Sequence, residues 1–170
     1  EEQINGFLYY VKQNPSTHGV IHYMANHDGF TLADLVSYDY RHNEENGESN
    51  NDGNTYNYSW NCGAEGDTRK SAVLEMRKRQ MRNAMLLLML SQGTPLLYGG
   101  DEFGNTQKGN NNAYCQDNVT GWVDWSKTGK DIGCTKFVQD VIAFRILHPI
   151  LHMPYELRAT DYKSLGWPEI

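Results

Sequence analysis

Two short apolar runs constrain the fold of this chain, because each ends in a turn of glycine and polar residues and a helix-forming stretch separates them. The first run, residues 20–24, reads VIHYM and is followed by ANHDG. The second, residues 96–98, reads LLY and is followed by GGDE. Residues 68–91 contain no glycine or proline and are rich in strong helix formers. The order strand, helix, strand predicts a βαβ unit with parallel strands, and hence the α/β fold class.

The residues that follow the two predicted strands are the first candidates for a functional site. In parallel α/β folds, and above all in (β/α)₈ barrels, the carboxyl ends of the strands carry the chemistry. Asn26, His27 and Asp28 follow the first run, and Asp101 and Glu102 follow the second. The alternative for His27 is a turn residue that bonds the backbone. The alternative for Asp101 and Glu102 is a structural role in which they accept hydrogen bonds from loop amides.

The other helices are predicted from apolar spacing and from start and stop signals. Residues 1–14 place apolar side chains on one face and end before a proline, which disfavours the α region for the residue that precedes it. Thr31 fits the N-cap of a short helix that carries Asp34 in its first turn. The stretch 84–90 is apolar nearly all round, so the last turns of the long helix are expected to be deeply buried. A final helix is predicted over residues 135–147, with Phe137, Val141, Ile142 and Phe144 facing inward.

Two long polar loops, residues 41–67 and 104–125, separate these elements. Loops of this length inside a domain are usually functional or disordered. The first contains Tyr56, Tyr58 and Trp60, whose flat rings can pack or stack. In the second, Asn111 and Tyr114 lie among other amide side chains, a mixture that suits sugar hydroxyls and sugar faces. The same mixture also suits a loop that bonds to itself.

Composition excludes several classes of partner. The formal net charge of the 170 residues is −6 and no stripe of lysine and arginine occurs, so neither a nucleic acid nor an anionic membrane is an expected partner. No run approaches the roughly 20 apolar residues of a membrane span. The chain is shorter than the roughly 200 to 250 residues of a complete (β/α)₈ barrel. Because it begins with glutamate rather than methionine, a processed product or a piece of a longer protein is expected.

No cofactor is expected from the metal-binding patterns of the sequence. The three cysteines are widely spaced and form no C-x-x-C pair, which argues against a zinc site and a disulfide framework and favours buried or half-buried free thiols. Glu48, Asn50 and Asp52 occupy odd positions of an EF-hand-like loop around Gly53, but Ser59 stands at the twelfth position, where a bidentate glutamate is required. A looser calcium site in this loop is left open.

A series of longer motifs resembles one known family. Residues 26–38 read NHDGFTLADLVSY and resemble the strand 7 region of isoamylase-type glycogen debranching enzymes, which belong to glycoside hydrolase family 13, the α-amylase superfamily. The resemblance covers roughly residues 20–147 and its ordered series is specific. Further matching motifs are HNE at 42–44, SWNCG at 59–63, SQGTP at 91–95 and GNNNAYCQDN at 109–118.

The resemblance implies a fold, an activity and roles for two residues. It implies a partial (β/α)₈ TIM barrel, with strands 7 and 8 and their helices, so that residues 1–170 are a C-terminal fragment of a catalytic domain. The parent would hydrolyse α-1,6 branch linkages of glycogen or amylopectin with retention of configuration, and its partner would be a branched α-glucan. Asp28 would stabilise the transition state, and His27 would hydrogen-bond the sugar. Since glycogen is an intracellular store and no export signal is visible, a cytoplasmic location is expected.

One departure from the family pattern limits what these residues do alone. The nucleophilic aspartate of the family lies on strand 4 and its acid/base glutamate on strand 5, and the strand 4 motif occurs nowhere in the chain. The isolated fragment is therefore expected to be inactive. Its open strand edges and apolar helix faces predict self-association or a rearranged packing that covers them. Two alternatives are a non-catalytic carbohydrate-binding or regulatory module derived from such a barrel, and an unrelated α/β domain in which Asn-His-Asp-Gly is only a turn.

Overall fold

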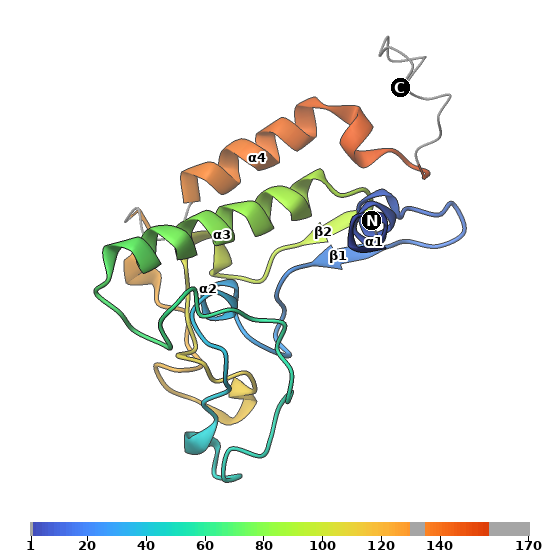
Figure 1. Ribbon diagram of the computed structural model, residues 1–170. Helices are drawn as coiled ribbons and strands as arrows, with labels where there is room; N and C mark the ends of the chain where they lie inside the picture. Colours follow the sequence, from blue (N-terminus) through green and yellow to red (C-terminus); the bar gives the residue numbers. More distant parts are fainter. Residues whose placement is uncertain (1, 130–134, 157–170) are drawn as a thin grey trace.

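The computed structural model describes residues 2–129 and 135–156 (Figure 1). Four α-helices and two strands occur in these ranges, with short 3₁₀ segments in the loops. The helices are α1 (Glu2–Lys12), α2 (Leu32–Leu35), α3 (Ser71–Leu90) and α4 (Thr135–Leu147), and the strands are β1 (Ile21–Tyr23) and β2 (Thr94–Leu96). The 3₁₀ segments are η1 (Glu44–Asn46), η2 (Asp101–Phe103), η3 (Ala113–Cys115), η4 (Trp125–Lys127) and η5 (Pro149–His152).

The βαβ unit predicted from the sequence is present. Strands β1 and β2 pair in parallel, with Ile21 opposite Thr94 and Tyr23 opposite Leu96, and α3 connects them. Strand β2 begins two residues earlier than predicted and includes Pro95, which lies opposite His22 of β1. The preceding Gly93 has φ +74° and lies so close to β1 that a Cβ would be 2.8 Å from the carbonyl oxygen of Val20. The close approach of the two strands therefore requires glycine here.

Helices α3 and α4 lie side by side above the sheet, and the two polar loops extend away from it on the other side (Figure 1). Between the helices lie Met85, Leu88, Val138 and Val141, all buried. The part of this core that contains Met85 and Val138 extends to α2 through Leu32. Burial of these side chains is the main contribution to the stability of the layer, at about 1.5–3 kcal/mol for each large one.

Two expectations about helix burial are wrong. In α3, Met85, Leu88 and Met89 are buried, but Leu86 and Leu87 are 37% and 36% exposed. In α4, Phe144 is 47% exposed and stacks on His148, with ring centroids 3.9 Å apart. The reason is that the described part of the chain covers only one side of each helix. An apolar residue on the far side has no neighbouring layer to pack against.

The sheet shows the same one-sided cover, although both of its strands come from apolar runs. His22 is 2% exposed and packs against the ring of Tyr10 in α1, with centroids 4.4 Å apart. The open sheet face consists of Ile21, Tyr23 and Leu96, which are 60%, 49% and 37% exposed. Successive side chains of a strand point to opposite faces, so α1 covers one face of the sheet and leaves the other open.

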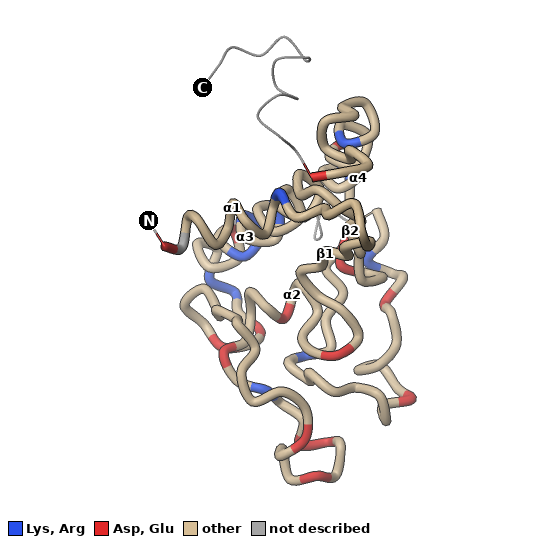
Figure 2. The backbone as a smooth tube through the Cα atoms, turned by 90° about the vertical axis from the view of Figure 1, so that its right-hand side faces the viewer, with Lys and Arg blue, Asp and Glu red and all other residues tan. Residues whose placement is uncertain are grey.

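Charged residues of both signs are distributed over the structure without a basic stripe. Figure 2 shows lysine and arginine mainly on the helices, and aspartate and glutamate mainly on the loops. No helix in the two described ranges is long and apolar enough to span a membrane. Cys62 is a buried free thiol and Cys115 an exposed one, whereas Cys134 and the tail from 157 onward, with Trp167 and Pro168, lie outside the described residues.

Candidate functional site

The turn after β1 places His27 and Asp28 in solvent. The Asn26 side chain stabilises the turn, because its Oδ1 accepts a hydrogen bond from the backbone N–H of Asp28 at 2.7 Å. Gly29 follows at φ +140°, a backbone conformation that side chains rarely adopt. Both His27 and Asp28 are exposed, and within the described ranges no hydrogen bond occupies either side chain. The turn therefore presents a carboxylate and an imidazole that are both available to a ligand.

Helix α2 begins where this turn ends, and its N-terminus is capped by two side chains. Thr31 is the N-cap, and its hydroxyl accepts a hydrogen bond from the N–H of Asp34 at 3.2 Å. The N–H of Leu32 donates to the carboxylate of Asp101 at 2.9 Å. The first N–H groups of a helix lack partners within the helix, so both bonds stabilise its start.

Asp101 and Glu102 both bond backbone amides, as in the structural alternative for these two acids. Asp101 is 3% exposed and accepts from Leu32, whereas Glu102 accepts from the N–H of Gly100 at 2.9 Å. Asp101 thus links the turn that follows β2 to the helix that follows β1. The Asp101 carboxylate is therefore buried against the start of α2, the helix that follows the His27–Asp28 turn, and is not in solvent.

The pKa values of two buried carboxyl groups are displaced upward. Burial raises the pKa of Asp101 to about 7, and the neighbouring charges of Glu102 and Asp34 act in the same direction, although the bond from Leu32 opposes them. Burial also raises the pKa of Asp34, which is fully buried. Protonation of Asp101 is therefore expected to change near neutral pH.

A buried pair of asparagines joins the two polar loops. Asn43 and Asn111 are both fully buried. The Asn43 amide donates to Asn111 Oδ1 at 2.8 Å, and the backbone N–H of Asn111 donates to Asn43 Oδ1 at 3.0 Å. The Asn111 amide nitrogen donates to the carbonyl of Asn54 and to Asn57 Oδ1, at 2.8 and 2.6 Å. Both amide hydrogens of Asn111 are used inside the protein, so its side chain serves the loop rather than a sugar.

Gly53 provides a test of this asparagine pair. It has φ +72°, and a Cβ would lie 2.2 Å from Asn111 Oδ1 and 2.8 Å from Asn43 Nδ2. Gly47 has φ +82° and open space around it, so Gly47→Ala is a matched control for backbone strain alone. We expect Gly47→Ala to lower the free energy of unfolding by about 1 kcal/mol and Gly53→Ala to lower it by about 3 kcal/mol, measured by urea denaturation. Equal losses would show that the pair contributes nothing beyond backbone strain.

Exposed aromatic rings lie on the loop that this pair anchors. Tyr56 and Tyr58 are 70% and 87% exposed, and their rings meet edge to face with centroids 4.5 Å apart. Tyr58 has φ +52°, an uncommon conformation for a residue with a bulky side chain. Asn57 between them is held by Asn111. On the second loop, Tyr114 is 80% exposed, so of the two sugar-binding candidates there it is the one that solvent can reach.

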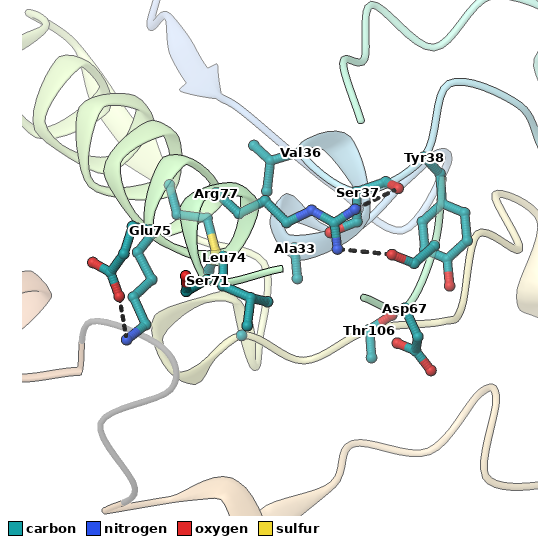
Figure 3. A pocket seen from close by; sticks show the side chains of 14 residues that line it. Ala33, Val36, Ser37, Tyr38, Asp67, Ser71, Leu74, Glu75, Arg77 and Thr106 are labelled. Carbon is teal, nitrogen blue, oxygen red and sulfur yellow. Dashed lines mark hydrogen bonds and ion pairs between the residues drawn. The ribbon is translucent and has the colours of Figure 1, made fainter. Parts of the chain in front are cut away.

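Two cavities lie away from the His27–Asp28 turn. One, of about 420 Å³, lies between α2 and the start of α3 (Figure 3). The guanidinium of Arg77 forms part of its wall, but it already donates to the carbonyls of Gly66 and Ser37, at 2.8 and 3.3 Å. The other cavity, also about 420 Å³, lies between the two polar loops and is lined by residues that include His42 and Lys108. Neither cavity contains a residue of the predicted site.

The acidic loop predicted as a possible calcium site is held by amides. Asp52 accepts hydrogen bonds from the amides of Asn46 and Asn112, at 2.7 and 2.8 Å, and these bonds, that of Asn46 first, hold its pKa below the ordinary value. Within residues 2–129 and 135–156, no group of three or more histidine, cysteine, aspartate or glutamate side chains is arranged to hold a metal ion.

Known structures share this fold. A pullulanase of Bacillus acidopullulyticus superposes with a TM-score of 0.61 at 21% identity, over 89% of this chain and 16% of that protein. A pullulanase of Paenibacillus barengoltzii in complex with maltotetraose gives 0.60 at 21% identity, over 88% of this chain and 20% of that protein. This likeness shows that the chain has the fold of one segment of these pullulanases.

Sequence comparison finds named relatives of higher identity. The chain is 52% identical over 130 residues to a glycogen operon protein GlgX homolog of Mycobacterium tuberculosis, and 56% identical over 107 residues to the chloroplastic isoamylase 1 of Arabidopsis thaliana. These alignments cover 76% and 63% of this chain, but 18% and 14% of the relatives. A glycogen debranching enzyme of Erwinia tasmaniensis is 48% identical over 140 residues, which are 82% of this chain and 21% of that protein. No family model matches.

The chain is thus a homologue of one segment of the isoamylase-type glycogen debranching enzymes, which confirms the resemblance seen in the sequence. It spans about a fifth of the length of these relatives. The alternative of an unrelated α/β domain is wrong, because 52% identity over 130 residues reflects common ancestry.

Proposed function

We propose that this chain supplies one catalytic carboxylate, Asp28, to an enzyme that hydrolyses α-1,6 branch linkages of glycogen- or amylopectin-type glucans. In this proposal β1 and β2 are strands 7 and 8 of a (β/α)₈ barrel, and residues 1–170 form the C-terminal part of its catalytic domain. The observation that carries the proposal is the exposed turn at the end of β1, which presents Asp28 and His27 in a homologue of the debranching enzymes.

The chemistry gives each of the two residues a task. Glycoside hydrolysis passes through a state in which the sugar ring resembles an oxocarbenium ion. An ionised carboxylate that bonds the sugar hydroxyls next to that ring stabilises the charge as it develops. Asp28 is exposed to solvent, so its carboxylate is accessible to a bound sugar. His27 can donate a hydrogen bond from a ring nitrogen to a sugar hydroxyl.

The other two carboxyl groups come from outside these residues in the proposed mechanism. A retaining glycosidase requires a nucleophile and an acid/base with carboxyl groups about 5 to 5.5 Å apart. The strand 4 motif with the nucleophile is absent from the sequence, so Asp28 acts in this scheme only together with an upstream part of the same protein. The open sheet face, with Ile21, Tyr23 and Leu96, is the surface that the upstream strands would cover.

The proposed substrate follows from the relatives and from the exposed rings. The names of the relatives refer to glycogen debranching and to isoamylase, and a structural neighbour is in complex with maltotetraose. Neutral sugars offer hydroxyls for amides and carboxylates, and apolar ring faces for aromatic side chains. Tyr114 is the exposed ring that we assign to sugar contact, with Asn26 beside the catalytic pair. Because glycogen is an intracellular store, we place the reaction in the cytoplasm.

The proposal is tested by comparing the full-length gene product with residues 1–170 alone. On amylopectin we expect the full-length product to release reducing ends and the isolated chain to release none, because it lacks two of the three carboxyl groups. Size-exclusion chromatography with light scattering should show the isolated chain self-associating through the open sheet face.

Two results would contradict this account. Hydrolysis by residues 1–170 alone would show that the chain holds its own nucleophile and acid. Glucan binding without hydrolysis by the full-length product would favour the alternative of a carbohydrate-binding module.

A further inference from the structure

Two buried carboxylates connect helix α2 to the loop that follows β2. Asp101, in η2, accepts the N–H of Leu32 at 2.9 Å. Asp34, in α2, accepts the N–H of Gln107 at 2.8 Å and the hydroxyl of Thr106. These bonds join residues about 70 positions apart in the sequence and run in opposite directions between the same two segments. We refer to Asp34 and Asp101 together as the carboxylate bridge.

The carboxylate bridge fixes the far end of the His27–Asp28 turn. That turn is held on one side by β1, which pairs with β2, and on the other by α2, which begins at Leu32. Helix α2 has only four residues, so its own hydrogen bonds contribute little to its position. Phe30 and Thr31, between Asp28 and Leu32, are 3% and 1% exposed, so a shift of α2 is transmitted to the turn through packed residues.

The residues that carry Asp101 are themselves fixed by close contacts. Gly100 has φ +99°, and a Cβ there would lie 2.7 Å from the Cβ of Asn105. The N–H of Asn105 donates to the carbonyl of Gly100 at 2.9 Å. The Asp101 carboxylate is thus presented from a rigid turn rather than from a loop that can follow α2.

We propose that Asp101 is a positioning residue for the reaction: by holding the first N–H of α2, it sets where the His27–Asp28 turn ends and therefore where the Asp28 carboxylate lies. This inference rests on the proposed function, because it requires that Asp28 acts on a substrate. It assigns to Asp101 no contact with the sugar. Asp34 supports this role, because from α2 it accepts the N–H of Gln107 in the loop that follows β2.

The protonation of Asp101 gives this role a distinct signature. Its pKa is raised to about 7 by burial, and the titratable groups that act on it are Glu102 in the same turn and Asp34 in α2, both acidic. A carboxyl group whose folded-state pKa is raised binds its proton more tightly in the closed arrangement than in solvent. Opening of the bond to Leu32 therefore becomes easier as the pH rises from about 4 to about 7. The bridge is tightest when Asp101 is protonated.

The test uses three variants of the full-length gene product. Asp101→Leu removes the acceptor of the Leu32 N–H. Asp101→Asn keeps an acceptor oxygen and carries no charge, so it resembles the protonated acid at every pH. Asp39→Asn is the matched control, because the exposed Asp39 carboxylate also accepts a backbone N–H from another loop, that of Asn61 at 2.7 Å.

Positioning predicts a specific pattern of kinetics on a branched α-glucan. We expect Asp101→Leu to lower kcat per folded molecule about tenfold or more with KM changed less than about threefold. We expect Asp101→Asn to have a kcat at least equal to that of the wild type, and Asp39→Asn to leave both kcat and KM unchanged. The ratio of wild-type kcat to Asp101→Asn kcat should be near one at about pH 5 and fall about threefold or more by about pH 8. In the wild type without substrate, hydrogen exchange of residues 26–35, corrected for its intrinsic rate, should become faster as the pH rises from about 5 to about 8. This measurement remains possible if Asp101→Leu fails to fold.

Each other outcome bears on a specific part of the account. An unchanged kcat in Asp101→Leu, equal impairment of the Asn and Leu variants, or a ratio that does not change with pH overturns the positioning role, provided that Asp28→Asn is impaired. Full activity in Asp28→Asn overturns the proposed function itself, and with it any need to position that carboxylate.

Discussion

Replacement of Asp28 by asparagine in the full-length gene product is expected to lower kcat on a branched α-glucan about 10²- to 10³-fold, with a much smaller change in KM. The substitution keeps the shape of the side chain and removes its charge. Because Asp28 is exposed and no described residue hydrogen-bonds its carboxylate, the folded structure should not change. The loss therefore falls on the transition state, where the sugar ring acquires positive charge.

The comparison of Asp28→Asn with a second carboxylate separates catalysis from general electrostatics. Asp39→Asn removes an equal charge from an exposed position and should retain full activity. His27→Ala should have an intermediate effect, since it removes one hydrogen bond to the sugar. If Asp28→Asn retains activity within about threefold of wild type, Asp28 does not stabilise the transition state.

The largest effect on stability is expected at Arg145. Arg145 is 8% exposed, and its guanidinium donates to the carbonyls of Met89, Ser91 and Gly93, at 2.7, 2.6 and 2.7 Å. These carbonyls lie at the end of α3 and the start of β2, so one side chain of α4 satisfies the acceptors where the helix ends. Replacement by methionine fills similar space but leaves three acceptors with fewer partners. We expect Arg145→Met to lower the free energy of unfolding by about 3 to 5 kcal/mol in urea denaturation.

Arg82→Met is the matched control for this experiment. Arg82 also lies where α3 and α4 meet, but it is exposed and its guanidinium lies 6.0 Å from the centre of the Phe137 ring. A change of about 1 kcal/mol or less is expected there, which is the usual size of an exposed cation–π contact. Equal losses in the two variants would show that the carbonyls at the end of α3 do not depend on Arg145.

Local sequence patterns predict the helices and the parallel strand pair well. The predicted final helix at 135–147 agrees with α4 at both ends, and the long helix starts three residues later than predicted because Lys70 is its N-cap. These elements depend on apolar periodicity and on glycine and proline, which are visible in one sequence. Strand β2 begins two residues earlier than predicted, because its pairing with β1 decides where it begins and local apolarity does not.

The contacts between distant segments could not be predicted in the same way. Asn43 and Asn111 are 68 positions apart, and their pairing depends on how two long loops meet. Asp34 was expected to serve the start of α2, yet its carboxylate also bonds Thr106 and Gln107. One usable signal was present: Arg145 lies four residues after Val141 and seven after Val138, which places a charge in the buried stripe of α4. A charged residue in such a stripe indicates backbone acceptors nearby.

Nuclear magnetic resonance of the anomeric protons during digestion of amylopectin tests the central claim most directly, because it resolves the linkage that is cleaved and the configuration of the product. With the full-length gene product, the account predicts that the α-1,6 signal decreases, that the α-1,4 signal stays constant, and that the new reducing ends appear first as the α-anomer. A constant α-1,6 signal, or a loss of α-1,4 signal instead, would contradict it.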